Sequence, residues 1–356
     1  MKWVRDNIRD LKKYKENISP YRIKLDANEG ENLFFKNIDD IDLDVLKEIN
    51  RYPDSSAEKL REKIGEYIGI NPENIIAGNG SSEMIELVMK TFIDKGDKIL
   101  SFVPTFAMYD IFSKIYSAEF IGIEGKSGDF STPRDDFSVD IDILIEKAKE
   151  INPKLILVCN PNNPTGDLIS SDDIEKLLKN TDALVVLDEA YIEFADVSMV
   201  DEIDKYKNLI VLRTLSKAIG LAGIRLGYMA ANREIIDWVS KVKAPYSLNS
   251  LTQAFGIMAI DRRDLIEDYI KREKTEREKM YNELKALGLK VYPTSTNFIL
   301  FYSEIDNLSG KTQNDGILIR EFAGDLEGYY RVTVGSKDEN IEFIKSLKEI
   351  LKDEKS

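Results

Sequence analysis

The sequence contains no histidine, and this absence excludes more chemistry than any other feature of its composition. Histidine is the side chain that most readily changes its charge near neutral pH, and it is the commonest metal ligand. Ser-His-Asp and Cys-His nucleophile systems are therefore excluded, as are zinc sites with histidine ligands, and we expect no metal site. If the protein is an enzyme, lysine, tyrosine, aspartate or glutamate must move the protons, or a cofactor must supply the difficult chemistry.

Cysteine, long apolar runs and an excess of positive charge are also missing. The single cysteine, Cys159, allows no intrachain disulfide and fits a reducing cytoplasm. The first residues lack the apolar run of a signal peptide, and no apolar run approaches the ~20 residues of a membrane-spanning helix. A net charge of −14 disfavours nucleic acid as a partner. We expect a cytoplasmic protein without membrane or nucleic-acid partners, in which a local basic pocket could still hold a small anion.

The 356 residues are enough for a sizeable core and for two domains of unequal size. Short apolar runs alternate with helix-like stretches such as residues 57–68 and 172–178. The runs are continuous rather than alternating, and they occupy residues 98–102, 155–159, 183–187, 209–212 and 226–230. This character is typical of central strands of a parallel sheet that is covered on both faces. We therefore expect an α/β fold with a mostly parallel, doubly wound sheet.

After about residue 245 the pattern changes to a long charged helix, further strand-like runs and a final helix around residues 340–351. The strand-like runs occupy residues 290–292, 297–301, 316–320 and 330–334. This order predicts a smaller α+β domain over residues 246–356, after a large domain over residues 28–245. Residues 1–27 would form an arm that packs on the small domain or on a partner subunit.

One lysine stands where a strand gives way to a glycine-rich loop. The apolar run Leu209–Leu212 leads into the segment Arg213–Gly227, which contains Lys217. Two hydroxyl groups and a guanidinium group share the segment, at Thr214, Ser216 and Arg225. A lysine can form an imine with an aldehyde cofactor, while neighbouring hydroxyl and guanidinium groups hold the phosphate of that cofactor.

Other chemically suggestive residues follow strands, and each taken alone has a second interpretation. A glycine turn leads into a helix near Ser81 and Ser82, which suits an anion but is also explained as a serine-capped helix. Asp188 ends an apolar strand and needs a partner, either a ligand or the helix that it caps. Phe106 offers an aromatic face or a core contact, and the loop Asn160–Gly166 carries three asparagines beside two prolines. Since ligands collect beyond the carboxyl ends of strands in open α/β sheets, the whole set indicates a ligand site.

In this order the segments resemble the pyridoxal-phosphate (PLP) enzymes of the aspartate-aminotransferase fold, and most closely the histidinol-phosphate aminotransferases. The resemblance covers nearly the whole chain and is strongest in Asn160–Gly166, Asp188–Phe194 and Arg213–Gly227. Supporting segments are residues 51–53, 243–246, 296–298 and 331–335. The resemblance implies a PLP-dependent transferase fold of type I, PLP as the cofactor and a homodimer with shared active sites.

The resemblance also implies a role for each matching residue toward the cofactor. Lys217 would bind PLP covalently and then move the α-proton of the substrate, which requires a neutral amine. Asp188 would pair with the pyridine nitrogen, and Phe106 would stack on the ring. Asn163 and Tyr191 would hydrogen-bond the phenolic oxygen. The phosphate would be held by donors of this chain and by one from the partner subunit, namely Ser81, Ser82, Thr214, Ser216, Arg225 and Tyr52.

For the substrate, Arg331 matches the arginine that binds the acid group beside the reacting carbon, and Arg320 matches a second arginine of that pocket. Guanidinium groups can bind both the carboxylate of glutamate and the phosphate of histidinol phosphate through forked hydrogen bonds. Without the resemblance, both arginines would be interpreted as surface charges on edge strands. Asn28 and Tyr14 match residues that line the substrate cavity. The segment 29–33 departs from the family, since it lacks the usual proline and carries an extra acid near the substrate mouth.

The favoured function is transfer of the amino group of L-histidinol phosphate to 2-oxoglutarate, which gives imidazole acetol phosphate and L-glutamate in histidine biosynthesis. One alternative is a lyase similar to threonine-phosphate decarboxylases. Another is an aminotransferase with an aromatic or other amino-acid donor, with Phe34, Phe35 or Tyr246 lining a broader pocket. A non-catalytic PLP-binding regulator is disfavoured by the acidic charge and by the lack of a DNA-binding module. An NAD-dependent oxidoreductase is disfavoured because no Gly-x-Gly-x-x-Gly follows the early strands.

Overall fold

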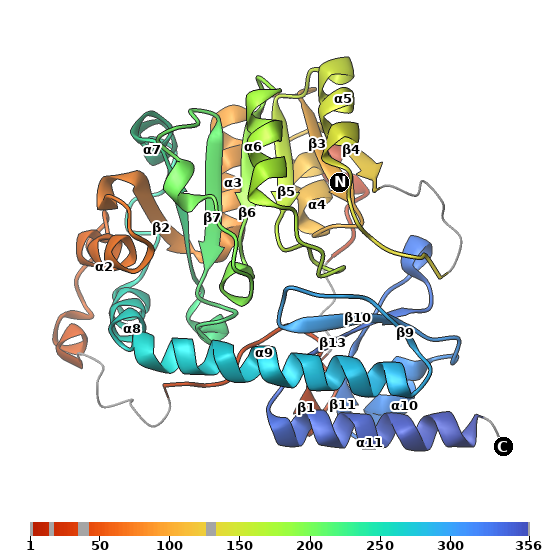
Figure 1. Ribbon diagram of the computed structural model, residues 1–356. Coiled ribbons are helices and arrows are strands. Elements are labelled where there is room, and N and C mark those ends of the chain that lie inside the picture. Colours follow the sequence, from red (N-terminus) through yellow and green to blue (C-terminus); the bar gives the residue numbers. More distant parts are fainter. Residues whose placement is uncertain (1–2, 14–17, 35–42, 126–132, 355–356) are drawn as a thin grey trace.

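The computed structural model describes residues 3–13, 18–34, 43–125 and 133–354. A seven-stranded sheet forms the upper part of Figure 1 and a four-stranded sheet the lower part. The strand order of the large sheet is β2-β8-β7-β6-β5-β3-β4. Its strands are β2 (Ile75–Asn79), β3 (Lys98–Val103), β4 (Glu119–Glu124), β5 (Leu155–Cys159), β6 (Leu184–Asp188), β7 (Leu209–Thr214) and β8 (Leu226–Ala231).

Helices cover both faces of the large sheet. One apolar core lies between the sheet and α2, α5, α6 and α8, and a second lies between the opposite face and α3, α4 and α7. These helices are α2 (Glu58–Ile68), α3 (Gly80–Phe92), α4 (Met108–Ile115), α5 (Ile141–Ile151), α6 (Ser171–Lys179), α7 (Arg233–Ser240) and α8 (Ser250–Asp261). Alternate residues of β5 enter opposite cores, with Ile156 and Val158 in the first and Leu155 and Leu157 in the second. Burial on both faces explains the continuous apolar runs, and the predicted doubly wound α/β fold is confirmed.

The direction of one strand was predicted wrongly. The run 226–230 was expected in the parallel set, but β8 pairs antiparallel with both of its neighbours, β7 and β2. The four pairings among β3, β5, β6, β7 and β4 are parallel. The short loop 215–225 between β7 and β8 leaves no room for the crossover helix that a parallel connection needs. An apolar run reports burial and not direction, so the sequence pattern could not separate the two.

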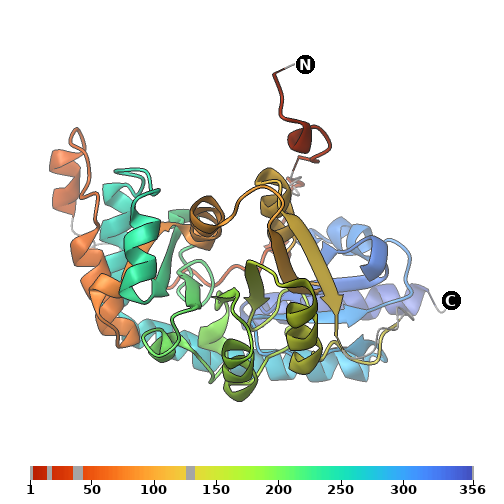
Figure 2. The ribbon, with the colours of Figure 1, turned by 90° about the horizontal axis from the view of Figure 1, so that it is seen from above.

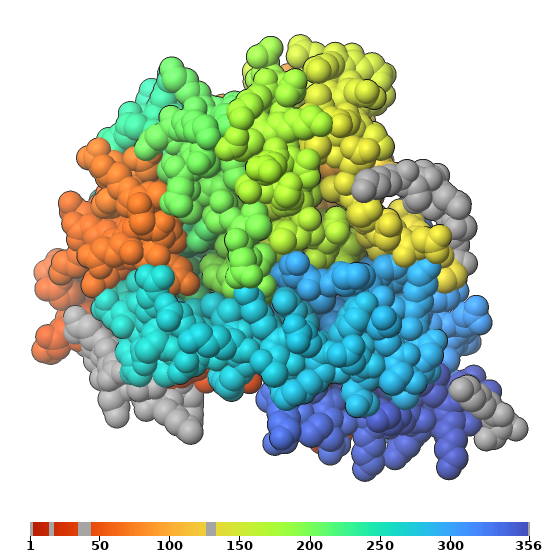
Figure 3. Space-filling model, in the orientation of Figure 1, coloured from red at the N-terminus to blue at the C-terminus, as the bar shows by residue number. Residues whose placement is uncertain are grey.

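The smaller sheet is antiparallel, with the order β12-β13-β10-β9. Its strands are β9 (Lys290–Val291), β10 (Phe298–Tyr302), β12 (Arg320–Glu321) and β13 (Tyr329–Thr333). The helices beside it are α9 (Arg263–Ala286), α10 (Leu308–Asn314) and α11 (Lys337–Asp353). The side chains of α9 cover the junction between the two sheets on the face shown in Figure 3.

The run 316–320 was expected to form one strand and is divided between two sheets. Its first half is β11 (Ile317–Leu318), which pairs in parallel with β1 (Ile23–Lys24). Its last residue begins β12, which pairs with β13. Ile317 to Ile319 are buried whereas Arg320 is exposed, so the apolar run again reports burial and does not identify the partner strand.

Residues near the N-terminus contact the helices of the large sheet as well as β11, with which β1 pairs. The short helix α1 (Asp6–Arg9) reaches α4, where the Asn7 amide donates to the carbonyl oxygens of Lys114 and Ile115 at 2.7 and 2.9 Å. In Figure 2 this end of the chain extends away from the body of the molecule. Within the described ranges, no helix is both long and apolar enough to cross a membrane.

Candidate active site

The strand directions bring several loops to one edge of the large sheet. Strands β2, β3, β5, β6 and β7 end at this edge, and β8, which runs the other way, begins there. A cavity of about 420 Å³ opens between these loops and the smaller sheet. With the exception of Tyr52, every predicted site residue that the structure describes lines it, namely Asn28, Ser81, Ser82, Phe106, Asn163, Asp188, Tyr191, Thr214, Ser216, Lys217, Arg225, Arg320 and Arg331.

One predicted cofactor residue, Tyr52, does not line this cavity in the single chain. Tyr52 is 81% exposed and stacks on Tyr246, with 4.6 Å between ring centroids. Tyr14 lies outside the described residues. The suggestion that Phe34 or Tyr246 widens the pocket is wrong for the single chain, since Phe34 is buried in the apolar core and Tyr246 is on the surface. Phe35 lies outside the described residues.

Two glycines let a set of anion-binding groups converge at one end of the cavity. A Cβ atom on Gly227 would lie 2.4 Å from the Ser81 nitrogen, and one on Gly80 would lie 2.7 Å from an Arg225 nitrogen. The backbone of β8 and the first turn of α3 therefore meet directly, and the positive end of the helix dipole faces the cavity. Two hydroxyl groups lie beside these donors. The Thr214 hydroxyl donates to the Ser216 hydroxyl oxygen at 2.9 Å, and Arg225 Nη1 lies 3.4 Å from the same Ser216 oxygen. Hydroxyl, amide and guanidinium donors in this arrangement suit a phosphate group.

Lys217 lies in the loop between β7 and β8. Its Nζ donates to the Ala27 carbonyl at 3.0 Å and lies 5.6 Å from the centroid of the Tyr191 ring. Burial lowers the pKa of Lys217 to about 7, and the positive charges of Arg331 and Arg225 act in the same direction, whereas Glu29 opposes them. A large share of this amine is therefore neutral near pH 7, as a nucleophile or a base requires.

Asp188 is buried at the end of β6, and its carboxylate has two donors. Tyr109 donates to Oδ2 at 3.0 Å, and the Ala190 N–H donates to Oδ1 at 3.2 Å. Burial raises the pKa of Asp188 to about 6, although both hydrogen bonds lower it. The alternative interpretation of Asp188 as a helix cap is wrong, because the next helical turn, η4 (Ile192–Phe194), has Tyr191 at its N-cap and no side-chain capping hydrogen bond. The Asp188 carboxylate lines the cavity. Tyr109 was missed, although a tyrosine that is buried normally needs a partner for its hydroxyl.

Four side chains form a hydrogen-bonded series across the cavity. Asn28 and Asn163 each donate to the Tyr191 hydroxyl oxygen, at 3.0 and 3.3 Å. The Asn163 oxygen accepts from Arg331 Nη1 at 2.5 Å, and Arg331 Nη2 donates to the Asp26 carbonyl at 2.9 Å. Because the Tyr191 oxygen already accepts two hydrogen bonds, its own hydrogen remains for an acceptor in the cavity.

The mouth of the cavity combines two arginines with residues that sequence reasoning missed. The guanidinium carbons of Arg320 and Arg331 lie 5.9 and 5.8 Å from the centroid of the Phe322 ring. Lys24 pairs with Glu29 at 2.7 Å and with Asp26 at 3.1 Å. Neither Lys24 nor Phe322 belongs to a sequence motif. The pairing of β1 with β11 places Lys24 here, and Phe322 directly follows β12 and donates its N–H to the Tyr329 carbonyl oxygen of β13 at 3.2 Å.

Residues 29–33, which depart from the family pattern, pack beside the loop of Lys217. A Cβ atom on Gly30 would lie 2.3 Å from the carbonyl oxygen of Lys217, so this segment packs directly on the loop of the lysine. The extra acid, Glu31, pairs with Arg272 of α9 at 3.2 Å and does not line the cavity. The expectation that the extra acid lies at the substrate mouth is therefore wrong, because its charge is directed to the long helix.

Comparison with known proteins agrees with this geometry. The family model described as aminotransferase class I and II matches residues 23–347. The chain is 42% identical to a histidinol-phosphate aminotransferase of Thermoanaerobacter sp. (strain X514), over 98% of both chains. The crystal structure of histidinol-phosphate aminotransferase from Sinorhizobium meliloti in complex with pyridoxal-5'-phosphate superposes with a TM-score of 0.87 at 19% identity, over 99% of this chain and 98% of that chain.

A second solved structure, the histidinol-phosphate aminotransferase from Clostridium acetobutylicum, superposes with a TM-score of 0.82 at 26% identity. It covers 93% of this chain and 99% of that chain. The family model spans most of the chain, and the Thermoanaerobacter relative is 42% identical over nearly its whole length. The chain belongs to the class I and II aminotransferases.

Proposed function

We propose that this aminotransferase uses PLP to transfer the amino group of L-histidinol phosphate to 2-oxoglutarate. The observation that carries the proposal is the convergence of Lys217, Asp188 and the phosphate-binding groups in one cavity. The chain that forms this cavity is 42% identical to a relative named for the reaction on histidinol phosphate. The two arginines near the mouth add a site for an acid group.

The cavity fits PLP by the chemistry of its donors. The amides of Ser81 and Ser82, the hydroxyls of Thr214 and Ser216, and Arg225 suit its phosphate. Gly80 leaves this end open, because a Cβ atom there would strike Arg225. Bound there, PLP would supply an electron-withdrawing ring that stabilises negative charge on the carbon that loses its proton.

Each side chain then has a defined task. With its pKa near 7, Lys217 would take the proton from the reacting carbon of the substrate and return it on the cofactor side. The buried negative charge of Asp188 would keep the ring nitrogen of PLP protonated. Tyr191 would donate its hydroxyl hydrogen to the phenolic oxygen, and Phe106 would exclude water from one face of the ring.

The substrate end is assigned to the arginines. Arg331 is buried and held by Asn163 and Asp26, so its guanidinium group is already oriented for the acid group beside the reacting carbon. Arg320 is exposed at the mouth and would bind the same group from outside. Carboxylate and phosphate can both occupy this place, because a guanidinium group binds either through paired hydrogen bonds.

The proposed function is tested by the visible absorption of the PLP-loaded protein when L-histidinol phosphate is added without a keto acid. The band of the lysine-bound cofactor should disappear within one turnover, because the amino group moves to the cofactor. It should return when 2-oxoglutarate is added. The matched control is L-histidinol, which lacks the phosphate that Arg331 would bind and should react far more slowly.

Each other outcome of this titration identifies an alternative. If the band persists with L-histidinol phosphate but disappears with an aromatic amino acid, the amino donor is the aromatic amino acid and not L-histidinol phosphate. If carbon dioxide is released from a phosphorylated amino acid and no keto acid is consumed, the reaction is decarboxylation and not amino transfer. If the protein shows no visible band after incubation with PLP, the proposal that PLP is its cofactor is wrong.

We also propose that the protein works as a homodimer in which Tyr52 reaches the phosphate of the cofactor in the second copy. In the single chain its side chain is exposed, stacks on Tyr246 and does not line the cavity. Tyr52→Phe should raise the Kd for PLP roughly 10-fold to 100-fold, because it removes a hydrogen bond to a charged group. Tyr246→Phe removes the hydroxyl of the ring stacked on Tyr52 and should leave the Kd unchanged. Equal Kd values for both variants, or a monomer in sedimentation, would contradict the role of Tyr52.

A further inference from the structure

The loop Asn160–Gly166 contains three asparagines, and the proposed function gives a task to Asn163 alone. Asn160 is used within its own loop, since its side chain exchanges hydrogen bonds with the backbone of Ile169 at 3.0 and 2.8 Å. Asn162 remains. It does not line the cavity that contains Lys217 and lines a small neighbouring cavity instead, which shares Thr105 and Cys159 with the larger one.

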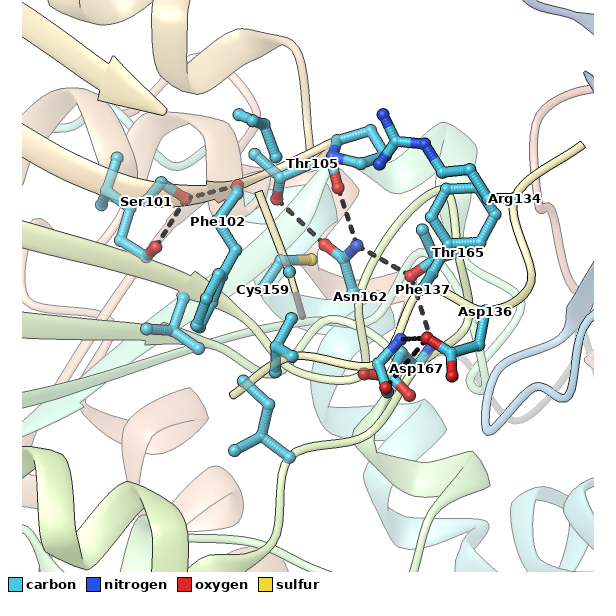
Figure 4. A pocket seen from close by; sticks show the side chains of 18 residues that line it. Ser101, Phe102, Thr105, Arg134, Asp136, Phe137, Cys159, Asn162, Thr165 and Asp167 are labelled. Carbon is cyan, nitrogen blue, oxygen red and sulfur yellow. Dashed lines mark hydrogen bonds between the residues drawn. The ribbon is translucent and has the colours of Figure 1, made fainter. Parts of the chain in front are cut away.

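The Asn162 side chain joins two loops that follow different strands. Figure 4 shows its amide between Thr105, which belongs to the loop after β3, and Thr165, which belongs to the loop after β5. The Thr105 hydroxyl donates to Oδ1 at 3.0 Å. Nδ2 donates to the Pro104 carbonyl and to the Thr165 hydroxyl, both at 2.9 Å. Both of its N–H groups and its oxygen are thus engaged.

These bonds lie one residue away from two groups that face the cofactor in the proposed function. Phe106 directly follows Thr105, and Asn163 directly follows Asn162. Phe106 also contacts Tyr109 edge to face, with 5.6 Å between centroids, and Tyr109 donates to Asp188. A change at Asn162 would therefore move the ring-stacking residue relative to the donor for the phenolic oxygen, without touching either.

We propose that Asn162 is a positioning residue that fixes Phe106 and Asn163 at the spacing that the PLP ring requires. This inference rests on the proposed function, because it assigns Asn162 a task toward the cofactor that the same site would bind. The Asn162 side chain acts only through the two loops. Its loss would free the loops that carry Phe106 and Asn163, and so weaken the hold that these two residues would have on the PLP ring.

The test compares Asn162→Ala with Asn160→Ala in the PLP-loaded protein. Both variants remove a hydrogen-bonded asparagine from the same loop, so a loss of stability alone would affect both. Asn162→Ala should lower kcat roughly 10-fold to 100-fold, because small misplacements of reacting groups cost that much, while KM changes less than about threefold. Thr105→Val, which removes one of the three bonds, should change kcat in the same direction by a smaller factor.

A spectroscopic measurement separates positioning from folding. Donors to the phenolic oxygen stabilise its negative charge and so lower the proton affinity of the lysine-bound cofactor. Asn162→Ala should raise the midpoint pH of the visible band by about 0.5 to 1 unit. Asn160→Ala should leave the midpoint at the wild-type value.

The wild-type protein is titrated first, so that the two proposals fail separately. A wild-type chain without a visible band would contradict the proposed function. A normal wild-type band, with equal midpoints and equal kcat in Asn162→Ala and Asn160→Ala, would contradict only the role of Asn162.

Discussion

Replacing Lys217 with alanine should lower kcat by about 10⁴-fold or more, because in the proposed function this one side chain supplies both the covalent attachment and the proton transfer. Among the described residues, the one other lysine that lines the cavity is Lys24. Burial disfavours the charged form of Lys24, but its carboxylate partners Glu29 and Asp26 outweigh this and raise its pKa. Lys24 is therefore protonated where Lys217 is neutral and cannot replace it.

Reduction with borohydride followed by mass spectrometry measures the attachment directly. The wild-type chain should gain the mass of the reduced cofactor on the peptide that contains Lys217, and the Lys217→Ala chain should gain none. Lys24→Ala should still be labelled at Lys217. A labelled Lys217→Ala protein, or one whose kcat lies within tenfold of the wild type, would show that Lys217 is not the reacting amine.

The site residues predicted from the sequence lie where a local sequence pattern and a chemically suitable side chain coincide. Lys217, Asp188 and Asn163 each follow an apolar run, and parallel strands bring the ends of such runs to one edge. The predicted α/β class followed from the same runs. Such runs do not predict strand direction, because burial on both faces selects the same apolar residues in an antiparallel strand such as β8 as in the parallel strands of the sheet.

The rest of the cavity depends on contacts between segments far apart in the sequence. Residues 26–30 contact the loop of Lys217, which lies about 190 residues further along the sequence. No local sequence pattern predicts such a contact. Glu31 illustrates the consequence, since its position beside Asn28 suggested the substrate mouth while its carboxylate pairs with α9. Tyr109 was missed for a different reason, because one tyrosine in a helix is usually explained by core packing.

Replacing Asp188 with asparagine should lower kcat by about 10³-fold while PLP still attaches to Lys217. Asparagine has nearly the same shape and can keep the contact with the Tyr109 hydroxyl, so the change removes mainly a buried negative charge. Without that charge the ring nitrogen of bound PLP would lose its proton, and the ring would withdraw electrons less strongly. The measurement is kcat together with the visible band, which should persist, and a kcat within tenfold of the wild type would contradict the assigned role.

Tyr109→Phe is the matched variant, because it leaves the Asp188 carboxylate in place and removes the hydroxyl that donates to it. Burial raises the pKa of Asp188 and the Tyr109 hydrogen bond lowers it, so without this bond the pKa rises further. The active carboxylate form is then lost at a higher pH as the solution is acidified. The acid limb of the plot of kcat against pH should therefore move to higher pH, while kcat at the plateau falls by less than tenfold. A profile with an unmoved limb would mean that Tyr109 supports the fold of this loop and not the charge of Asp188.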